Sequence, residues 1–401
     1  MTQPLSGLRF LDLTRLLPGP AATMHLADFG AEVIKIEDTG EGDYMRVMPP
    51  RVADADGESV NPVFAAVNRG KRSMRVDLKT AGGRDVLLRL VETADALIEQ
   101  FRPGVMDRLG LGWDVLHARN PRLVRCSLTG YGQNGPLAQA AGHDLNYCAL
   151  AGVLDQNRAS STGAPAIPNL QIGDLLGGTL ASLSALLMAV IGAQRTGQGS
   201  RVDVAMTDAL LVHHFMPHAV LDGGDTPVPS QTLLTGGVPC YRIYETRDDR
   251  HLALGALELK FWQAFCEGAG LSDLAKRHWA LGETPGSQAA HDTIERVAAR
   301  LRERTLGEWL EALAKVDTCV APVLTPAEAL QHPQALAREL VHRRGGVTHV
   351  GRLARFDDAA WTPPATASSG AHTFELLREL GYKEKAIEEL RATGSVRGES
   401  S

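Results

Sequence analysis

The first third of the chain alternates short apolar runs with longer segments in which apolar residues recur every three or four positions. Short apolar runs bounded by turn residues predict strands, and the longer pattern predicts amphipathic helices. Pro18, Gly19 and Pro20 are expected to break the chain between the first strand and the first helix. Strands separated by helices of this length predict βαβ units and a mostly parallel sheet. The predicted strands are residues 8–13, 32–37, 73–77, 96–98 and 123–128, and the predicted helices are residues 21–29 and 79–94.

Beyond Asp174 the pattern predicts a long Ala/Leu-rich helix, and residues 201–206 follow as a strand. Further predicted elements are a hairpin of residues 241–246 and 251–256, helices at 260–269, 292–314 and 373–380, and a frayed tail from residue 394. Residues 222–235 are rich in Gly, Asp and Pro, which indicates a linker. The predicted organisation is a large domain (1–221), this linker, a small domain (236–330) and a C-terminal segment (331–401).

The apolar stretch at residues 175–193 is long enough to cross a membrane. It contains glycine, threonine and serine, has Arg195 as the basic residue near its ends, and lacks a flanking aromatic anchor. These features favour a buried helix over a membrane span. Residues 1–7 lack the basic and apolar regions of a signal peptide, so a cytoplasmic protein without a membrane partner is expected.

The charge balance is mildly acidic, with 41 Lys and Arg against 47 Asp and Glu and a net charge of −6. Binding to nucleic acid needs a broad basic surface, so nucleic acid is not the expected partner. The five cysteines are scattered, and their spacing matches neither a zinc site nor a CxxC redox motif. Such cysteines are typical of a reduced, intracellular protein.

Several standard motifs are absent from the sequence, including the GxxxxGK[ST] phosphate loop, the GxGxxG fingerprint and the GxSxG nucleophile elbow. His213, His214 and His218 have a spacing that suits a metal on one helix face. Pro217 would disturb that face, so we interpret these residues as a polar helix end and expect no metal site.

A polar segment around His143 stands out from apolar surroundings and follows a glycine-rich stretch at residues 130–136. Glycines at this density suggest a loop whose backbone closely surrounds a bound group. A histidine in such a loop is a candidate general base, although a lone loop histidine is more often structural.

Two acidic residues are further candidates, and each also has a structural interpretation. Asp174 directly precedes the long apolar helix, where it would act either as a helix N-cap or as an acid–base group beside free backbone N–H groups. Position alone favours the cap. Glu258 lies at a strand-to-helix junction and would either cap the helix or orient an imidazole.

Basic residues gather in the first third of the chain, which suits a cofactor tail that carries phosphate. They are Arg69, Lys71, Arg72, Arg75, Lys79, Arg102 and Arg108. A set of short motifs accompanies these basic residues, at residues 18–20, 26–35, 68–73, 76–79, 101–105, 128–132, 195–199 and 372–382. Together, these motifs resemble the family III CoA-transferase (CaiB/BaiF) superfamily, and in particular its racemase branch.

The resemblance implies an α/β fold with a Rossmann-like large domain, to which the C-terminal segment returns, and a smaller α+β domain. It also implies an interlocked homodimer that binds an acyl-CoA substrate, with the active site at the subunit interface and no cofactor beyond the CoA moiety. Asp38 stands where the racemase branch has a basic CoA contact, so that role is not transferred. The residues carried over as CoA or substrate contacts are Arg72, Val76, Lys79, Arg102, Arg108, Gly142, Asp144 and Tyr147.

The resemblance leaves two activities open. Transferases of the family use the aspartate at the position of Asp174 as a nucleophile that forms an anhydride. The racemase branch pairs that aspartate with a histidine, here His143, which an acid at the position of Glu258 supports. A second base is hard to explain in a pure transferase, so a racemase of 2-methylacyl-CoA thioesters is favoured. A non-catalytic acyl-CoA-binding protein is a third hypothesis, which would leave all three groups idle.

Overall fold

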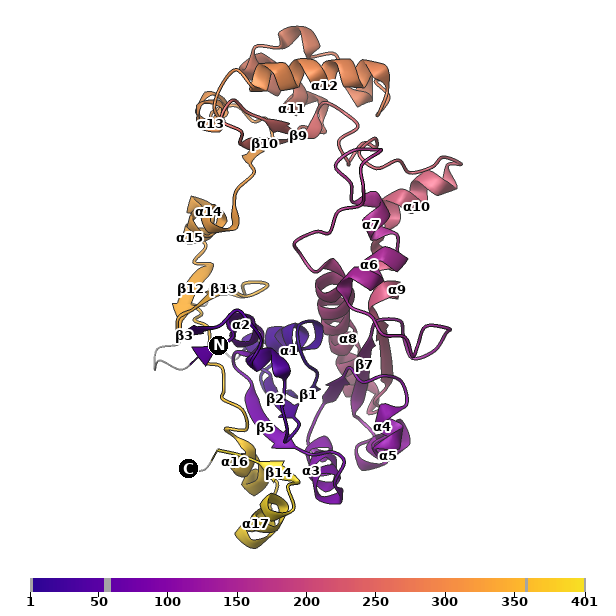
Figure 1. Cartoon of the computed structure of the whole chain (residues 1–401), viewed down its shortest axis with the longest axis vertical. Coiled ribbons are helices and arrows are strands. Elements are labelled where there is room, and N and C mark those ends of the chain that lie inside the picture. Colours follow the sequence, from indigo (N-terminus) through magenta and orange to yellow (C-terminus); the bar gives the residue numbers. More distant parts are fainter. Residues whose placement is uncertain (1–2, 54–58, 358–359, 400–401) are drawn as a thin grey trace. The chain divides into compact units, whose positions relative to one another are not determined.

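The computed structural model describes residues 3–53, 59–357 and 360–399 of the 401-residue chain, and Figure 1 traces them by colour. The chain forms two compact units, each assembled from separate stretches of sequence. Unit 1 comprises Met1–Ala151, Asn169–His213 and Pro333–Ser401. Unit 2 comprises Gly152–Pro168 and His214–His332.

The largest sheet among the described residues belongs to unit 1 and has the strand order β14-β5-β2-β1-β6-β7-β8. All neighbouring pairs in this sheet are parallel except β14 with β5. Its six parallel strands, numbered along the chain, follow the order 3-2-1-4-5-6 of doubly wound folds, so the winding direction reverses between β1 and β6. The strands are β1 (Arg9–Leu13), β2 (Glu32–Glu37), β5 (Arg72–Val76), β6 (Ala96–Glu99), β7 (Val124–Thr129), β8 (Arg201–Ala205) and β14 (Val396–Arg397). The predicted parallel α/β sheet is confirmed.

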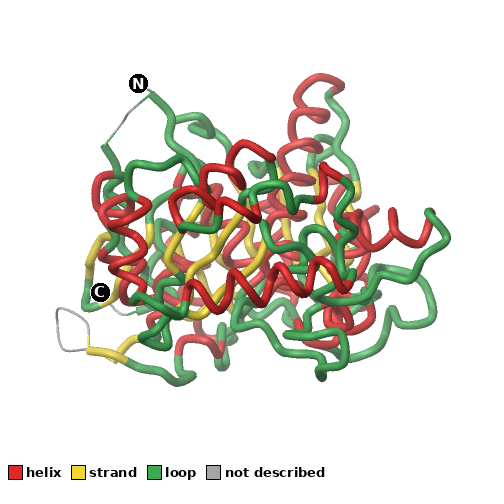
Figure 2. The backbone as a smooth tube through the Cα atoms, turned by 90° about the horizontal axis from the view of Figure 1, so that it is seen from above, coloured by secondary structure: helices red, strands yellow, loops and turns green. Residues whose placement is uncertain are grey.

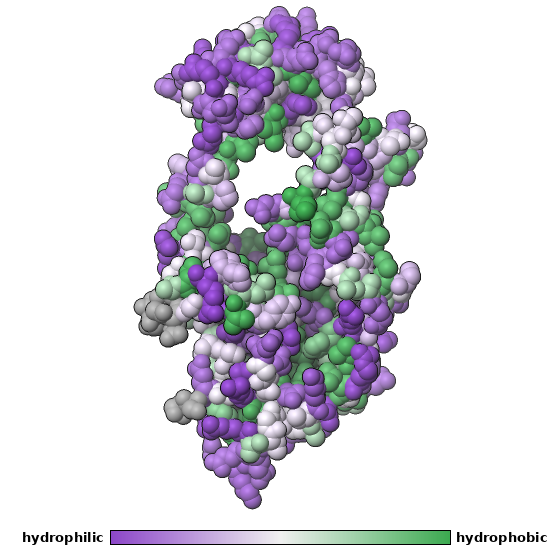
Figure 3. All heavy atoms as spheres, in the orientation of Figure 1, coloured by the Kyte–Doolittle hydropathy of each residue, from purple (hydrophilic) through white to green (hydrophobic). Residues whose placement is uncertain are grey.

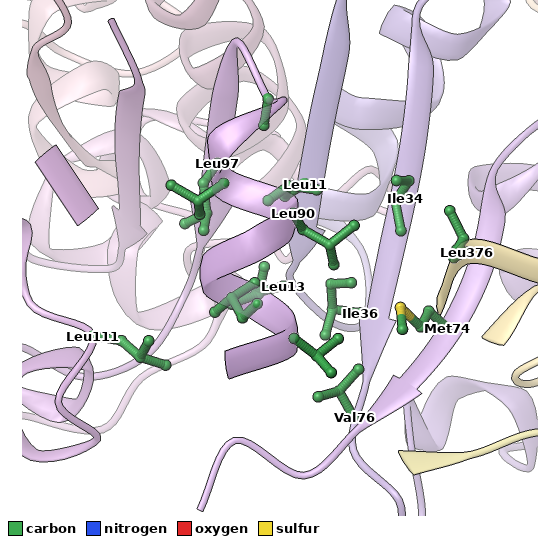
Figure 4. Packing of buried hydrophobic residues seen from close by; sticks show 14 of the residues in the cluster. Leu11, Leu13, Ile34, Ile36, Met74, Val76, Leu90, Leu97, Leu111 and Leu376 are labelled. Carbon is green, nitrogen blue, oxygen red and sulfur yellow. The ribbon is translucent and has the colours of Figure 1, made fainter. Parts of the chain in front are cut away.

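Helices cover this sheet, which explains why its central strands are buried along almost their whole length (Figure 2). α1 (Pro18–Asp28) packs on β1 and β2, α3 (Ala81–Glu92) on β5, and α8 (Ala181–Thr196) on β7 and β8. Leu90 of α3 lies among Leu11, Leu13 and Ile36 of the sheet (Figure 4). Each fully buried leucine of this core contributes roughly 1.5–3 kcal/mol.

Two predicted boundaries in unit 1 are wrong. α1 begins at Pro18 instead of after Pro20, because proline is well tolerated in the first turn of a helix, where its missing N–H is not needed. Residues 395–397 of the predicted frayed tail pack on the sheet: β14 pairs with β5, Val396 is buried, and Asp77 N–H donates to the Ser395 carbonyl at 2.9 Å. A two-residue strand carries too little pattern to be recognised from sequence.

The long apolar helix begins as a π-helix over Gly173–Leu180 and continues as α8. By length and composition alone, Gly173–Thr196 would suffice to span a membrane, and 39% of its most apolar window is buried within the chain. The predicted buried helix is therefore buried on one face, while Met188 and Ile191 of α8 are exposed. Other apolar side chains also reach the surface (Figure 3).

Unit 2 contains an antiparallel sheet of β9 (Tyr241–Glu245), β10 (His251–Gly255) and β11 (Val320–Pro322). The predicted hairpin is thus confirmed. Its helices are α11 (Leu259–Ala269), α12 (Gln288–Leu301) and α13 (Leu306–Leu313), and buried Trp262 and Trp309 lie in its core. The single helix predicted at 292–314 is wrong, because Thr305 and Glu308 form a capping box that starts a new helix.

The remaining elements are short. In unit 1 they are β3 (Val52–Ala53), β4 (Ser59–Val60), α2 (Pro62–Asn68), α4 (Val105–Arg108), α5 (Trp113–Arg119), α6 (Asp144–Leu150), α9 (Met206–His213), α15 (Pro333–Ala337), β12 (Val341–Arg344), β13 (Val347–Val350), α16 (Thr373–Glu379), α17 (Glu384–Ala392) and a 3₁₀ turn at Tyr44–Arg46. In unit 2 they are α7 (Val153–Gln156), α10 (Phe215–Asp222), α14 (Pro326–Gln331) and 3₁₀ turns at Ser272–Leu274 and Trp279–Leu281.

Candidate active site

A cavity of about 410 Å³ opens in unit 1 at the carboxyl ends of the parallel strands. Its wall includes residues that directly follow β1, β6 and β8, together with the end of β7. Ligands of doubly wound sheets bind at this edge, where the winding direction reverses. His143 and Asp174, which are 31 positions apart in the sequence, line the same cavity. The structure thus brings together the two strongest acid–base candidates of the sequence.

His143 occupies the N-cap position of α6, and its backbone is anchored on both sides. Its N–H donates to the Asn146 side-chain oxygen at 3.1 Å, and its carbonyl accepts from the Asn146 N–H at 2.8 Å. The side chain is exposed and lines the cavity, and His143 and Asn146 form the capping box of α6. An anchored backbone with an exposed ring at the cavity suits a group that exchanges protons with a ligand.

Asp174 is the second residue of the π-helix, and its carboxylate does not cap the helix. The prediction that Asp174 is the N-cap is therefore wrong. The helical turn starts earlier, since Leu175 N–H already donates to the Gln171 carbonyl at 2.8 Å. The carboxylate is half-buried in the cavity wall. The predicted free N–H groups beside it are already engaged, because Asp174 N–H donates to Asp144 Oδ1 at 3.0 Å and Leu175 N–H donates to Gln171. π-Helical turns are frequent at functional sites.

The surroundings of Asp174 shift its proton affinity. The pKa of Asp174 is raised to about 6, chiefly by burial and also by the negative charge of Asp144, while His143 acts in the opposite direction. A carboxyl group with such a pKa is present in both protonation states near neutral pH, as a general acid and base requires.

Tyr147 supports the glycine-rich loop that carries His143. Its ring packs so closely on Gly130 that a Cβ at Gly130 would overlap the ring, and a Cβ at Gly142 would lie 2.8 Å from Tyr147 Cε1. The hydroxyl group donates to the Gly142 carbonyl. Burial raises the pKa of Tyr147 to about 12, so the phenol stays neutral and keeps donating. Glycine at these two positions thus allows the Tyr147 ring to pack against the loop, and the predicted contact of the loop backbone with a bound group stays a prediction.

Glu258 belongs to unit 2, whereas His143 and Asp174 belong to unit 1. It holds the N-cap backbone position of α11, but its exposed carboxylate makes no capping bond. The structural interpretation as a helix cap therefore describes its backbone and not its side chain. Its predicted role of supporting the imidazole stays a prediction.

The predicted CoA contacts lie in different environments. Arg102 is exposed and lines the cavity. Lys79 follows β5, and Arg108 is the last residue of α4. Val76 packs in the hydrophobic core, and Arg72 forms ion pairs of 2.7–2.8 Å with Glu32, Glu375 and Glu379. The structure holds no ligand that would test these contacts.

Two of the basic residues in the first third of the chain are buried in ion pairs. Arg69 pairs with Asp28 at 2.6 Å, and Lys71 pairs with Asp12 at 3.0 Å. Both cations therefore serve the interior of unit 1 and are not available to a phosphate in solution. The sequence could not separate them from Arg102, because their counter-charges lie 41 and 59 positions away.

Several cavity residues carry no chemical signal in the sequence. Leu16, Gln100 and Met206 come from three segments that are distant along the chain. Leu16 and Gln100 closely follow predicted strands, and Met206 is the last residue of one, so the carboxyl-end rule for parallel sheets was the available signal.

The three histidines near α10 do not assemble a metal site: among residues 3–53, 59–357 and 360–399, no three His, Cys, Asp or Glu side chains form a group that could hold an ion. The rings of His214 and His218 stand edge to face with centroids 5.7 Å apart. Pro217 lies in the first turn of α10, where it does not break the helix.

Comparison with known proteins places this fold and site in a family. The model of CoA-transferase family III matches residues 5–373. The alpha-methylacyl-CoA racemase of Mus musculus is 34% identical over 396 residues, covering 97% of this chain and 96% of that protein. The acetyl-CoA:oxalate CoA-transferase of Acetobacter aceti is 33% identical over 374 residues, covering 90% and 92%. The crystal structure of a CAIB/BAIF family protein from Brucella suis superposes with a TM-score of 0.81 at 29% identity, covering 95% of this chain and all of that one.

The chain therefore belongs to CoA-transferase family III and is an enzyme of this family of transferases and racemases. The predicted family is confirmed. Its relatives include both racemases and transferases at nearly equal identity, so membership alone does not separate the two activities.

Proposed function

We propose that the protein is a racemase of 2-methylacyl-CoA thioesters. The observation that carries this proposal is the pair of His143 and Asp174 in one cavity, with an aspartate poised to exchange a proton near neutral pH. Inversion at Cα needs one group to remove a proton from one face and a second group to deliver a proton to the other. A transferase needs the aspartate but has no evident use for the histidine.

The reaction is a 1,1-proton transfer. Neutral His143 takes the Cα proton, and the electron pair of the C–H bond moves into the thioester to form an enolate. Protonated Asp174 then donates its proton to the opposite face, which leaves charged His143 and ionised Asp174 ready for the reverse reaction. The positive end of the helix dipole at the start of the π-helix stabilises the negative enolate oxygen.

The acyl-CoA is both the substrate and the source of the CoA moiety, and the chemistry needs no metal or redox cofactor. Arg102 is the best-placed cation for the phosphates, because its exposed side chain lines the cavity. We further propose a homodimer in the cytoplasm, in which Glu258 supports His143 at the subunit interface as the resemblance implies. Exposed apolar side chains of unit 1, including Met188, Ile191 and Val212, are suited to burial in such an interface.

Proton NMR of one 2-methylacyl-CoA enantiomer in deuterated buffer, without a carboxylate acceptor, tests the proposal. We expect loss of the α-proton signal and formation of the racemate. Asp174→Asn is the matched control, because it keeps the size of the side chain but removes the acid–base group. Retention of the α-proton and of optical purity with active, folded wild-type protein would overturn the racemase assignment.

The second candidate function is CoA transfer to a carboxylic acid, which the similarity to the acetyl-CoA:oxalate and succinyl-CoA:glutarate CoA-transferases favours. Asp174 would attack the thioester carbonyl, release CoA as thiolate and form a mixed anhydride. A panel of acceptor acids and trapping of the anhydride with hydroxylamine test this candidate. Acceptor-dependent exchange together with modified Asp174 would support it over racemisation.

The proposed dimer is tested by mixing two inactive variants, His143→Ala and Glu258→Ala. If Glu258 of one subunit supports His143 of the other, mixed dimers contain an intact site and part of the activity returns. Absence of any recovery, although sedimentation shows that mixed dimers form, would place both residues within one subunit.

A further inference from the structure

We propose that Asp144 is a positioning residue that sets the geometry between His143 and Asp174. This inference rests on the proposed function and deepens it, since the resemblance alone implies only a substrate contact for Asp144. The proton-transfer scheme does not use the side chain of Asp144, and this inference assigns it a role.

The covalent chain and one hydrogen bond together connect the two bases through Asp144. It is the first residue of α6 and directly follows His143. Its Oδ1 accepts the backbone N–H of Asp174 at 3.0 Å, across 30 positions of sequence. One carboxylate thus ties the start of α6 to the start of the π-helix, and the two bases extend from these two helix starts.

The surroundings leave this carboxylate little freedom. A Cβ at Gly173 would lie 2.9 Å from Asp144 Oδ1 and 3.2 Å from the Asp144 carbonyl oxygen, so glycine is needed for the two helix starts to approach. Buried Cys148 lies behind the other oxygen, with Sγ 4.0 Å from Asp144 Oδ2. Asp144 is held between the π-helix on one side and its own helix on the other.

The same carboxylate also acts through its charge. Besides burial, the negative charge of Asp144 raises the pKa of Asp174, and it also raises the pKa of Tyr147 and Cys148. The titratable groups on which this charge acts are therefore Asp174, Tyr147 and Cys148, while His143 directly precedes Asp144 in the chain. Asp144 has two separable effects, because an acceptor oxygen fixes geometry whereas a negative charge favours the protonated form of Asp174.

Asp144→Asn separates these effects, because the amide keeps an acceptor oxygen and loses the charge. We expect the titration of Asp174, followed by ¹³C NMR of labelled aspartate carboxyl groups and assigned with Asp174→Asn, to move to lower pH. For the substrate enantiomer from which ionised Asp174 removes the proton, the acid limb of the kcat/KM profile should move in the same direction. Asp144→Ala also loses the acceptor, and the displaced base should lower kcat about 100-fold, with KM changed less than about threefold.

Asp114→Asn is the matched control, since Asp114 is an exposed aspartate in the first turn of α5, outside the cavity wall. It should change neither the Asp174 titration nor kcat. A raised KM with unchanged kcat in both Asp144 variants would identify Asp144 as a substrate contact only and overturn the positioning role. An unchanged Asp174 titration in Asp144→Asn would overturn the electrostatic part.

The NMR titration needs no substrate, so it separates this inference from the proposed function. If wild-type protein fails to exchange the α-proton, the racemase assignment fails, while the Asp174 titration still reports on Asp144. The kinetic comparison is then repeated with anhydride formation as the readout.

Discussion

Two aspartates of unit 1 are partly or wholly removed from solvent, and their environments have opposite effects. Asp12 is fully buried at the end of β1, where Lys71 and the hydroxyl groups of Thr14 and Thr23 contact its carboxylate. Burial alone would raise the pKa of Asp12, but the charges of Lys71 and Lys35 and the two hydroxyls outweigh it, so the pKa falls well below its usual range. No lysine or arginine among the described residues pairs with Asp174, and burial is the main cause that raises its pKa to about 6.

The difference shows that burial does not by itself decide the charge of a carboxyl group. Asp12 is surrounded by donors that stabilise its charged form, so it is permanently ionised and holds structure together. Asp174 is left with a neighbouring carboxylate and no bonded donor, so it is free to take and give a proton. A single protein thus uses one residue type as a fixed charge and as an acid–base group.

The largest expected effect concerns the rate of racemisation at the site that contains Asp174. His143→Ala removes one of the two bases, so racemisation should fall by about 10²- to 10⁴-fold. The Kd for CoA, measured by calorimetry, should stay within about threefold, because the imidazole is not expected to bind the CoA moiety. Unchanged turnover would show that His143 is not a base.

The next largest effect concerns the structural aspartate, Asp12, and the stability of the fold. Asp12→Ala leaves the Lys71 ammonium buried without its counter-charge, so the free energy of unfolding should fall by about 3–5 kcal/mol in urea titrations. The control is Glu92→Ala, which breaks the exposed Glu92–Arg119 pair of unit 1 and should cost less than about 1 kcal/mol. Equal losses in the two variants would show that burial does not distinguish these pairs.

A third prediction concerns how the stability of the folded chain depends on pH through Asp174. Because the pKa of Asp174 is higher in the folded than in the unfolded chain, the folded state binds this proton more tightly. The stabilisation of the folded chain by this bound proton is fully present below pH 4, is lost as pH rises to about 6, and stays lost at higher pH. Asp174→Asn removes this loss, so the variant should be more stable than wild type by roughly 1–3 kcal/mol at pH 8 and no more stable at pH 4.

Urea titrations at both pH values measure this third effect. An Asp12→Asn variant should behave in the opposite way, because Asp12 stabilises the fold above its unfolded pKa and loses that contribution as pH falls. Equal stability of Asp174→Asn and wild type at pH 8 would contradict the raised proton affinity.

The smallest effect concerns the packing of the loop that carries His143. Gly130→Ala places a methyl group against the Tyr147 ring, which should cost about 1–3 kcal/mol of stability and lower kcat by displacing Gly142 and His143. Gly192→Ala is the control, because no atom lies within 4 Å of its added Cβ in α8, and it should be neutral or stabilising by up to about 1 kcal/mol. Circular dichroism melting curves and initial rates report both variants.

Much of the fold was accessible from sequence, because strong local patterns coincide with the elements. The strands of the parallel sheet, the hairpin of unit 2 and the long apolar helix follow from apolar periodicity and from turn residues. Proline at the start of α1 and the capping box at Thr305 shifted boundaries, since these signals act at single positions. Strand β14 is held by its partner β5, so its own residues carry almost no signal.

The candidate site likewise has features that the sequence shows and features that only the tertiary structure shows. The amino-acid sequence by itself determined the chemical types: a histidine in a glycine-rich segment, an aspartate beside a helix start, and the motifs that resemble family III CoA-transferases. Only the tertiary structure decided which groups share a cavity, since His143 and Asp174 meet through strand order and through the Asp144 hydrogen bond. It also decided their charge states, because burial and the nearest ions depend on segments distant along the chain.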